Sequence, residues 1–364
     1  MSAKIAQLKE WYEEHERRLA TFSLLFGFVF DSLTLTRIDA LQDNLWLFGN
    51  LVVIGVCIIL LNRQENDGIQ DKEVSKHFWL YNLLQFGFGN ILGGFFVLYF
   101  RSGTLAVSWP FLLILLVAMV ANELFQKRYA RLVLQISFLY LTIYAFLIFI
   151  VPIALHRIGA WIFLASGLVS LLAVWLFLIA LHQFSRERFR ESRVSIVRSV
   201  AAIFAVMNIL YFTNLIPPIP LSLKDAGIYH NVEKLPSGRY SVLEEEEKGI
   251  MSFFDFRKDI HLVSGNTLFA YSAIYSPSDL DTQIVHEWQH YDEKQGEWLT
   301  STTIPLRLSG GRVEGFRTYS SKSSLAPGPW RVNVSTPRGQ LLGRINFEIV
   351  SVNSYPAIKA VVKD

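Results

Sequence analysis

The pattern of hydrophobic and polar residues changes a little beyond the middle of the chain. Up to about Pro220, long apolar runs follow one another, separated by short polar stretches. A bilayer core about 30 Å thick requires roughly 20 apolar residues of helix, so these runs are candidates to cross a membrane. The first run, residues 19–35, is the weakest candidate because it is short and carries Asp31. The sequence therefore predicts a membrane α-helical bundle of about seven spans, near residues 19–35, 45–61, 78–100, 105–125, 133–155, 160–181 and 195–216.

Beyond Pro217, Pro218 and Pro220, which cannot continue a helix, the pattern becomes an alternation of apolar and polar residues. Turn residues separate the alternating stretches, which is typical of short β-strands. We expect strands near 260–264, 268–275, 283–291, 298–306, 312–320, 330–335, 341–350 and 357–362. Strands at this spacing predict an all-β antiparallel sandwich of immunoglobulin-like type.

These patterns divide the chain into four parts. Residues 1–18 carry aromatic and aliphatic residues at helical spacing among charges, which predicts an interfacial helix on the cytoplasmic side. Residues 19–216 form the transmembrane helical domain. Residues 217–250 are expected to be a linker leading into the β-module, and residues 251–364 are the β-sandwich module itself.

The distribution of charge then predicts how the chain is oriented in the membrane. The chain has 364 residues, 52% of them hydrophobic, and a net charge of only +3, which is no nucleic-acid signal. Its lysines and arginines alternate between loops: fifteen fall on one side of the predicted spans and three, Arg37, Arg101 and Arg157, on the other. The positive-inside rule therefore places the N-terminus in the cytoplasm and the β-module outside. The single cysteine, Cys57, allows no disulfide within the chain.

Polar residues inside the predicted spans have two interpretations. Asp31 is the only acid deep in a span, and residues 78–100 carry Asn82, Gln85 and Asn90 among several glycines. Such residues can line a substrate path, because polar groups in lipid are costly and often functional. They can equally join neighbouring helices by hydrogen bonds, while the glycines allow close packing.

One motif suggests a zinc protease, His286-Glu287-x-x-His290. In such enzymes the two histidines converge on one ion from the same face of a helix. Here the surrounding residues predict a strand, in which positions four apart stand about 13 Å apart. We therefore expect no metal site, no catalytic residue and no cofactor.

A cluster of aromatic and cationic residues surrounds that motif. The members are His286 and Trp288 on one predicted strand, Arg317, Tyr319 and Lys322 on another, and Trp330 at the start of a third. If their faces adjoin, they make a patch suited to an anion or a sugar. In the alternative interpretation the two tryptophans fill the core, and Arg317 pairs with a local carboxylate such as Glu314 or Glu287.

Several ordered motifs resemble a known family. They read P-P-I-P-L-S-L-K-x-x-G-I-Y-H, I-V-H-x-W, G-G-R-x-x-G-F-R-T-Y-S-S-K, G-x-W-R-V-x-V-x-T-x-x-G and L-G-R-I-x-F, within about residues 213–350. They are similar to an uncharacterised bacterial multi-pass membrane family whose C-terminal module is a domain of unknown function, DUF2914. The resemblance implies a bacterial inner-membrane protein with its β-module in the periplasm. It implies no activity, so no functional residue is transferred.

Four functions follow from these observations. The leading hypothesis is a non-enzymatic membrane protein whose β-module binds an envelope glycan, a lipid headgroup or a periplasmic protein. The alternative is a transporter or lipid-handling protein that uses Asp31 and the polar face of residues 78–100. A sensor is disfavoured because no cytoplasmic segment is long enough for an output domain, and a hydrolase is the weakest hypothesis.

Overall fold

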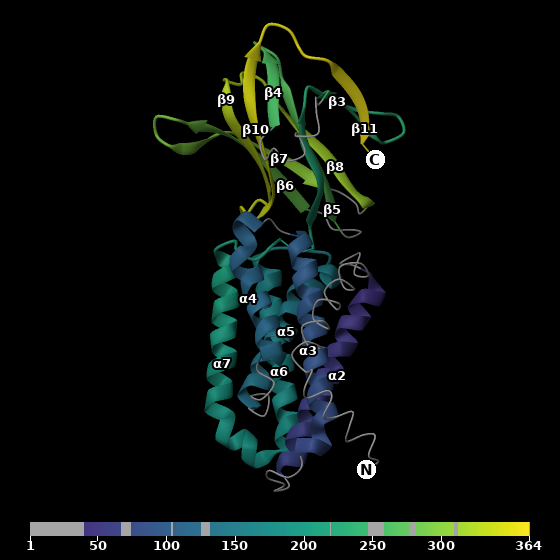
Figure 1. Ribbon diagram of the computed structural model, residues 1–364, viewed down its shortest axis with the longest axis vertical. Helices are drawn as coiled ribbons and strands as arrows, with labels where there is room; N and C mark the ends of the chain where they lie inside the picture. The colour runs from purple at the N-terminus through teal and green to yellow at the C-terminus, as the bar shows by residue number, and fades with distance from the viewer. Residues whose placement is uncertain are drawn as a thin grey trace. The chain divides into compact units, whose positions relative to one another are not determined.

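The computed structural model describes residues 40–66, 74–102, 105–124, 132–218, 220–246, 258–276, 282–308 and 312–363 (Figure 1). The predicted interfacial helix, the first predicted span and Asp31 lie outside the described residues. The chain divides into two compact units, one helical and one built of β-strands.

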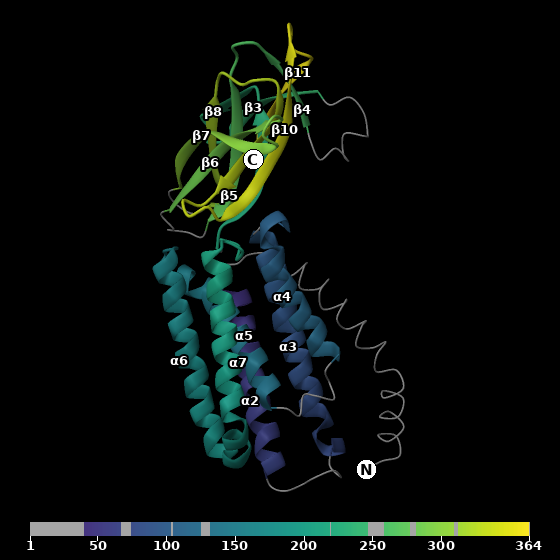
Figure 2. The same cartoon turned by 90° about the vertical axis from the view of Figure 1, so that its left-hand side faces the viewer.

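The helical unit contains six helices in its described part, which lie side by side in both views (Figure 1, Figure 2). They correspond to the second to seventh predicted spans. Their bounds are α2 (Leu41–Asn66), α3 (Val74–Ser102), α4 (Leu105–Leu124), α5 (Leu132–Leu155), α6 (Ala160–Phe184) and α7 (Arg186–Phe212). Helix α7 begins nine residues before its predicted span, because its first turns are charged and the prediction followed only the apolar run.

Five of these helices are long and apolar enough to cross a membrane, and α4 contributes a shorter apolar stretch, Val107–Asn122. Their outward surfaces are apolar as well. On α6, the side chains of Trp161, Leu168 and Trp175 are 83%, 65% and 57% exposed. Large apolar surfaces of this kind are unfavourable in water and suit a lipid environment, so the helices are consistent with membrane insertion.

Close approach between the helices depends on glycine. A Cβ at Gly87 of α3 would lie 2.8 Å from Ile54 Cγ1 of α2, and one at Gly167 of α6 would lie 2.8 Å from the Tyr144 hydroxyl of α5. Small residues at such contacts let helices pack closely in a membrane. Gly87 of α3 therefore takes part in helix packing, as the structural interpretation of that segment predicts.

Buried polar side chains also join the helices. Asn62 Nδ2 donates to Gln135 Oε1 over 2.8 Å, and Arg188 Nη1 donates to Asn62 Oδ1 over 3.0 Å, which links α2, α5 and α7. In α3, the backbone carbonyl of Gln85 accepts a hydrogen bond from Asn122 Nδ2 of α4 over 3.0 Å. These bonds satisfy polar groups that would otherwise be costly inside the bundle.

The β unit contains eleven strands in its described part, arranged in three sheets. The sheet orders are β1-β5-β8, β4-β10-β9-β6-β7 and β11-β3-β2. The strands are β1 (Ser222–Tyr229), β2 (Asn231–Lys234), β3 (Tyr240–Glu245), β4 (Lys258–Val263), β5 (Leu268–Ser276), β6 (Thr282–Asp292), β7 (Glu297–Leu308), β8 (Arg312–Lys322), β9 (Gly328–Ser335), β10 (Leu341–Val352) and β11 (Ile358–Lys363).

All eight predicted strands are present, as β4 to β11, but two predictions are corrected. Residues 222–245 are not a linker, because they form β1, β2 and β3. Lys224, Asp225 and Glu233 interrupt the apolar alternation there, so the sequence pattern is weak. The sheets are also not entirely antiparallel, since β4 pairs in parallel with β10.

The sheet β1-β5-β8 lies between the other two sheets, because β5 buries both of its faces. Leu268 and Ala270 pack with Trp288 of the five-stranded sheet. Tyr271 and Ala273, on the opposite face of β5, pack with residues of β2 and β3, including Val232 and Val242. The β unit therefore has three layers and two hydrophobic cores, rather than the two layers of a simple sandwich.

We expect Gly167→Ala to destabilise the helical unit. The added Cβ would crowd the Tyr144 hydroxyl and also Phe204 Cε2, 3.1 Å away, where the Tyr144 and Phe204 rings stack. Overpacking of this kind costs about 1–3 kcal/mol. Thermal denaturation of the full-length protein in detergent measures the loss.

The matched control is Gly49→Ala in α2, where the added Cβ meets no heavy atom within 4 Å. That change should leave the melting temperature unchanged or raise it, because alanine favours a helix over glycine by up to about 1 kcal/mol. Equal melting temperatures for the two variants would contradict the packing described here.

Candidate functional site

The zinc-protease motif lies in a strand, as predicted. His286, Glu287 and His290 all belong to β6, and His286 is fully buried. Among the described residues, no three histidine, cysteine, aspartate or glutamate side chains are placed to hold one metal ion. The geometry of β6 directs His286 into the protein core.

Three of the six predicted ligand-binding residues are core residues. His286, Trp288 and Trp330 are 0%, 0% and 3% exposed, because they lie on the inward faces of β6 and β9. The interpretation in which the tryptophans fill the core is therefore the one that their burial supports. The other interpretation, an exposed patch that includes these three side chains, does not agree with their burial.

The remaining three residues lie on β8 and divide between its two faces. Lys322 shares a face with Ser320, and its Nζ donates to Thr302 Oγ1 over 2.6 Å and lies 5.8 Å from the centre of the Trp330 ring. Tyr319, on the other face, is 38% exposed and lies 6.1 Å from the ring of Tyr240. Of these two residues, Lys322 lies near another member of the predicted cluster, Trp330, whereas Tyr319 points towards the sheet β11-β3-β2.

Arg317 shares the face of Tyr319 and is buried there, near Tyr271. Burial raises the pKa of Tyr271 to about 12, although the charge of Arg317 opposes this shift. The face of β8 that meets His286 is the one that carries Ser320, so the structure does not bring Arg317 and His286 together on one face. A shift of one residue along a strand reverses the face of every side chain.

The buried His286 is held between two serines. Its Nε2 lies 2.9 Å from Ser272 Oγ and its Nδ1 lies 2.9 Å from Ser320 Oγ, while Trp288 Nε1 donates to Ser320 Oγ over 3.0 Å. Desolvation by burial lowers the pKa of His286 to about 4. The imidazole is therefore neutral at pH 7 and acts as a hydrogen-bonded link between β5, β6 and β8.

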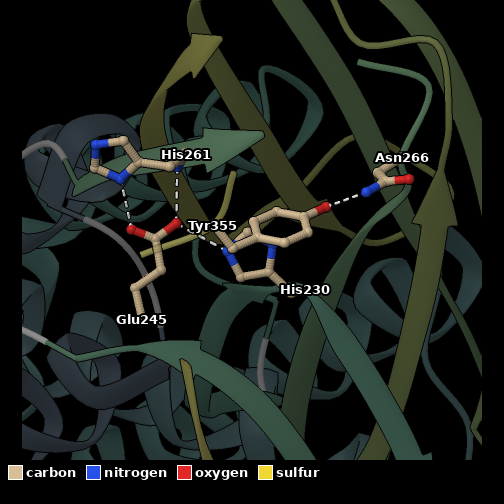
Figure 3. Close-up of polar contacts among 5 residues, drawn as sticks. All are labelled: His230, Glu245, His261, Asn266 and Tyr355. Carbon is tan, nitrogen blue, oxygen red and sulfur yellow. Dashed lines mark hydrogen bonds and ion pairs between the residues drawn. The ribbon is translucent and has the colours of Figure 1, made fainter. Parts of the chain in front are cut away.

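A second polar cluster joins the sheet β11-β3-β2 to β4 (Figure 3). Glu245 Oε1 accepts hydrogen bonds from His230 Nε2 over 2.8 Å and from the backbone N–H of His261 over 2.7 Å. Glu245 Oε2 accepts a third from His261 Nδ1 over 2.7 Å. The ring of Tyr355 packs on His230, 4.8 Å away, and its hydroxyl accepts a hydrogen bond from Asn266.

The charge state of Glu245 follows from these contacts. Burial by itself would raise the pKa of Glu245, but the hydrogen bonds from His230 and His261 outweigh it, so the pKa lies below its usual range. The cluster holds one ionised carboxylate between two imidazoles contributed by different elements. We interpret it as a structural clasp, because Glu245 uses both oxygens in contacts that connect strands.

A third polar cluster lies on the five-stranded sheet, on the side away from its hydrophobic core. We call this side the outer face. Its members alternate with the core residues along β6 and β9, and they extend to β7 and β10. They are Glu287, Gln289, Trp298, Thr300, Arg331, Asn333 and Arg344. Gln289 and Asn333 are nearly buried, with 8% and 7% of their surface exposed.

Hydrogen bonds connect the members of the outer face across four strands. Thr300 Oγ1 donates to Glu287 Oε1 over 2.7 Å, and Asn333 Nδ2 donates to Glu287 Oε2 over 3.1 Å. Arg331 Nε donates to Gln289 Oε1 over 2.6 Å, and Arg344 Nε donates to Asn333 Oδ1 over 2.7 Å. Each side chain therefore fixes the position of its neighbour.

The charges of the outer face are partly removed from water. Burial lowers the pKa of both Arg331 and Arg344, whereas the charge of Glu287 raises it. The Arg331 guanidinium lies over the Trp298 ring, 4.3 Å from its centre, and Tyr291 packs beside the same ring at 5.2 Å. An arginine stacked on an aromatic ring and bonded through Nε presents its terminal nitrogens in a fixed orientation.

The outer face was not predicted from the sequence, because the prediction followed the other set of alternate residues. On β6 it selected His286 and Trp288 as candidate binding residues, and outside the zinc-protease motif it considered Glu287 only as a possible partner of Arg317. The sequence did contain an indication of the outer face. In Glu287-x-x-x-Tyr291 and Arg331-x-Asn333, the named residues occupy the positions that alternate with the apolar ones. Choosing between the two sides requires knowing which one is buried.

Comparison with known proteins identifies one domain family in the chain. Residues 281–349 match the family described as "Protein of unknown function (DUF2914)". The chain therefore carries a DUF2914 domain in its C-terminal half, which confirms the resemblance inferred from its motifs. No curated protein matches the chain.

Several solved structures show similarity at low identity. An immunoglobulin-like protein from Pseudomonas aeruginosa is 12% identical over 36% of this chain and 98% of its own, with a TM-score of 0.21. A β-glucosidase from Listeria innocua is 15% identical over 33% of this chain and 17% of its own, with a TM-score of 0.20. The alkylpurine DNA glycosylase AlkC from Pseudomonas fluorescens is 9% identical over 86% of this chain and 99% of its own, with a TM-score of 0.22.

We expect the β unit to lose stability between pH 7 and pH 5 because of His286. Its pKa is about 4 in the folded state and 6.5 ordinarily, so below pH 6.5 the unfolded state binds the proton preferentially. The free energy of unfolding should fall by about 2 kcal/mol over this interval. Hydrogen exchange of the β5 and β6 amides in the full-length protein measures the loss.

The control variant is His286→Gln, which retains hydrogen-bonding capacity but does not titrate. It should be less stable than the original protein at pH 7 and should lack this contribution to the pH dependence. The same pH dependence in both proteins would rule out His286 as its source. Glu245 should contribute little to the change between pH 7 and pH 5, because its pKa in the folded state is below the usual range for a glutamate.

Proposed function

We propose that this chain is an inner-membrane protein whose β-module lies in the periplasm and binds an envelope ligand through its outer face, without catalysing a reaction. The single observation that carries the binding function is the hydrogen-bonded network of Glu287, Gln289, Arg331, Asn333 and Arg344 on one face of a sheet. Binding sites commonly combine aromatic surface with a few fixed polar groups, and this face has both.

The membrane topology in this proposal has seven spans, with residues 19–35 as the first. Five long apolar helices and one shorter apolar helix in the described residues support the membrane location. The alternation of lysine and arginine between loops supports a cytoplasmic N-terminus and an external β-module.

Transport is the less supported alternative. The contacts near Gln85, Gly87 and Gly89 run between helices, with Asn122 of α4 and Ile54 of α2 as partners. Contacts of this kind are those expected of packing residues. The observations on α3 therefore favour a packing role for Gly87, Gly89 and the backbone at Gln85.

The topology predicts which engineered cysteines react with a membrane-impermeant maleimide in intact spheroplasts. With Cys57 replaced by alanine, Ser323→Cys in the β-module should be labelled. Glu187→Cys, at the start of α7, should be labelled only after the membrane is permeabilised. Both native side chains are exposed on the protein surface. Labelling of Glu187→Cys but not Ser323→Cys in intact spheroplasts would reverse the proposed orientation.

Binding at the outer face predicts the outcome of photo-crosslinking in cells. A benzophenone amino acid at Thr300, an exposed position on β7 beside Glu287, should capture envelope saccharide, lipid or protein. The same amino acid at Lys359, an exposed position on β11 in another sheet, should capture much less. Equal capture at the two positions, or none at Thr300, would contradict binding at the outer face.

A further inference from the structure

The outer face holds two arginines as neighbours. Arg344 of β10 pairs with Asn333 of β9, and Arg331 lies two residues before Asn333 on the same strand. Arg331 and Arg344 are therefore diagonal neighbours on two antiparallel strands. Residues in this relation are about 7–8 Å apart, and their side chains lie on the same side of the sheet. Burial and then the charge of Arg344 lower the pKa of Arg331.

Both guanidinium groups are held in place through one nitrogen and remain available through the others. Arg331 and Arg344 each use Nε, in hydrogen bonds to Gln289 and Asn333. Within the described part of the chain, the terminal nitrogens of both arginines have no hydrogen-bond acceptor. These nitrogens are the groups that bind a carboxylate or phosphate in a bidentate manner.

The charges around the two arginines do not balance. Glu287 is the carboxylate that interacts electrostatically with both, and its two oxygens already accept hydrogen bonds from Thr300 and Asn333. Two partly desolvated cations therefore share one carboxylate. A second anion would restore the balance, because partly buried charges are stabilised by a partner of opposite sign.

The neutral groups of the outer face indicate what carries that anion. The exposed Thr300 hydroxyl can accept a hydrogen bond from a ligand hydroxyl group, and the half-buried Trp298 and Tyr291 rings offer apolar surface beside it. Sugars are bound by this combination of hydrogen-bonding side chains and aromatic rings. A saccharide chain that bears acidic groups would match both the charge and the neutral groups.

We propose that the outer face binds an acidic saccharide chain, whose carboxylate or phosphate groups contact the guanidinium groups of Arg331 and Arg344. This inference rests on the proposed function and names the class of ligand for the same face. The sugar rings lie against Trp298 and the polar side chains of β6 and β7. Arg331 and Arg344 supply the specificity for charge.

The test is a binding titration with the full-length protein in nanodiscs of a zwitterionic lipid. The probes are oligogalacturonate and a phosphorylated mannan oligosaccharide, each compared with the neutral oligosaccharide of the same length. We expect at least one acidic probe to bind and both neutral ones to bind at least about tenfold more weakly. Affinity should fall as salt concentration rises, because screening weakens exposed charge pairs.

Variants locate the binding site. Arg331→Gln and Arg344→Gln should each raise the Kd of the bound acidic probe by about tenfold or more, since each removes a charge-assisted contact. Arg239→Gln, an exposed arginine in the turn between β2 and β3, loses the same charge elsewhere and should change the Kd by less than about twofold. Unchanged hydrogen exchange in β6 and β9 would show that the variants remain folded.

Three outcomes would overturn the inference: neither acidic probe binds, both glutamine variants bind like the original protein, or the protein binds anionic-lipid vesicles but no saccharide. The proposed function is judged separately, by the labelling and crosslinking experiments above. Crosslinks at Thr300 together with any of these three outcomes would leave the proposed function intact and exclude the acidic saccharide. An inverted labelling pattern would refute the proposed topology, whatever the titration shows.

Discussion

The architecture of the β unit depends on the burial of both faces of β5. Ala270 and Ser272 point towards the five-stranded sheet, whereas Tyr271 and Ala273 point towards the sheet of β2, β3 and β11. A strand buried on both sides has no surface to offer a ligand. It obliges each neighbouring sheet to turn one face inward, so that a binding surface can form only on their outer faces.

The polar groups inside this arrangement are tolerated because they are bonded. His286 and Trp288 are both fully buried, and Ser320 bonds to both of them. Without these bonds, each buried polar group would cost about 1–3 kcal/mol. The clasp of Glu245 with His230 and His261 follows the same principle at the opposite sheet. The fold thus accounts for His286, His230 and His261 as structural residues. The outer face is therefore the candidate binding site.

Much of the fold could be predicted from the sequence, because it is encoded in local periodicity. The apolar runs located six helices in the described residues, and the alternation located β4 to β11. Of the three strands that were missed, β1 carries Lys224 and Asp225, and β2 carries Glu233 and is only four residues long. Their place is decided by long-range packing, such as that of Val232 against Tyr271, which local periodicity does not record.

The candidate site was less accessible to sequence reasoning for a related reason. Periodicity divides β6 into two sets of residues, but it does not say which set faces the core. Histidine and tryptophan side chains suggest binding, and at His286 and Trp288 they serve the core instead. Glutamine and asparagine attract less attention, yet Gln289 and Asn333 hold the Nε groups of Arg331 and Arg344.

The low exposure of these two amides distinguishes the outer face from an ordinary solvated sheet surface. On such a surface, polar side chains extend into water and lose little by moving independently. Gln289 and Asn333 are instead almost enclosed by the side chains to which they bond. Ordering long side chains costs conformational entropy, up to about 2 kcal/mol for an arginine. Arg331 and Arg344 are already ordered by hydrogen bonds within the protein. A ligand that binds their terminal nitrogens therefore loses less binding free energy to the ordering of these side chains.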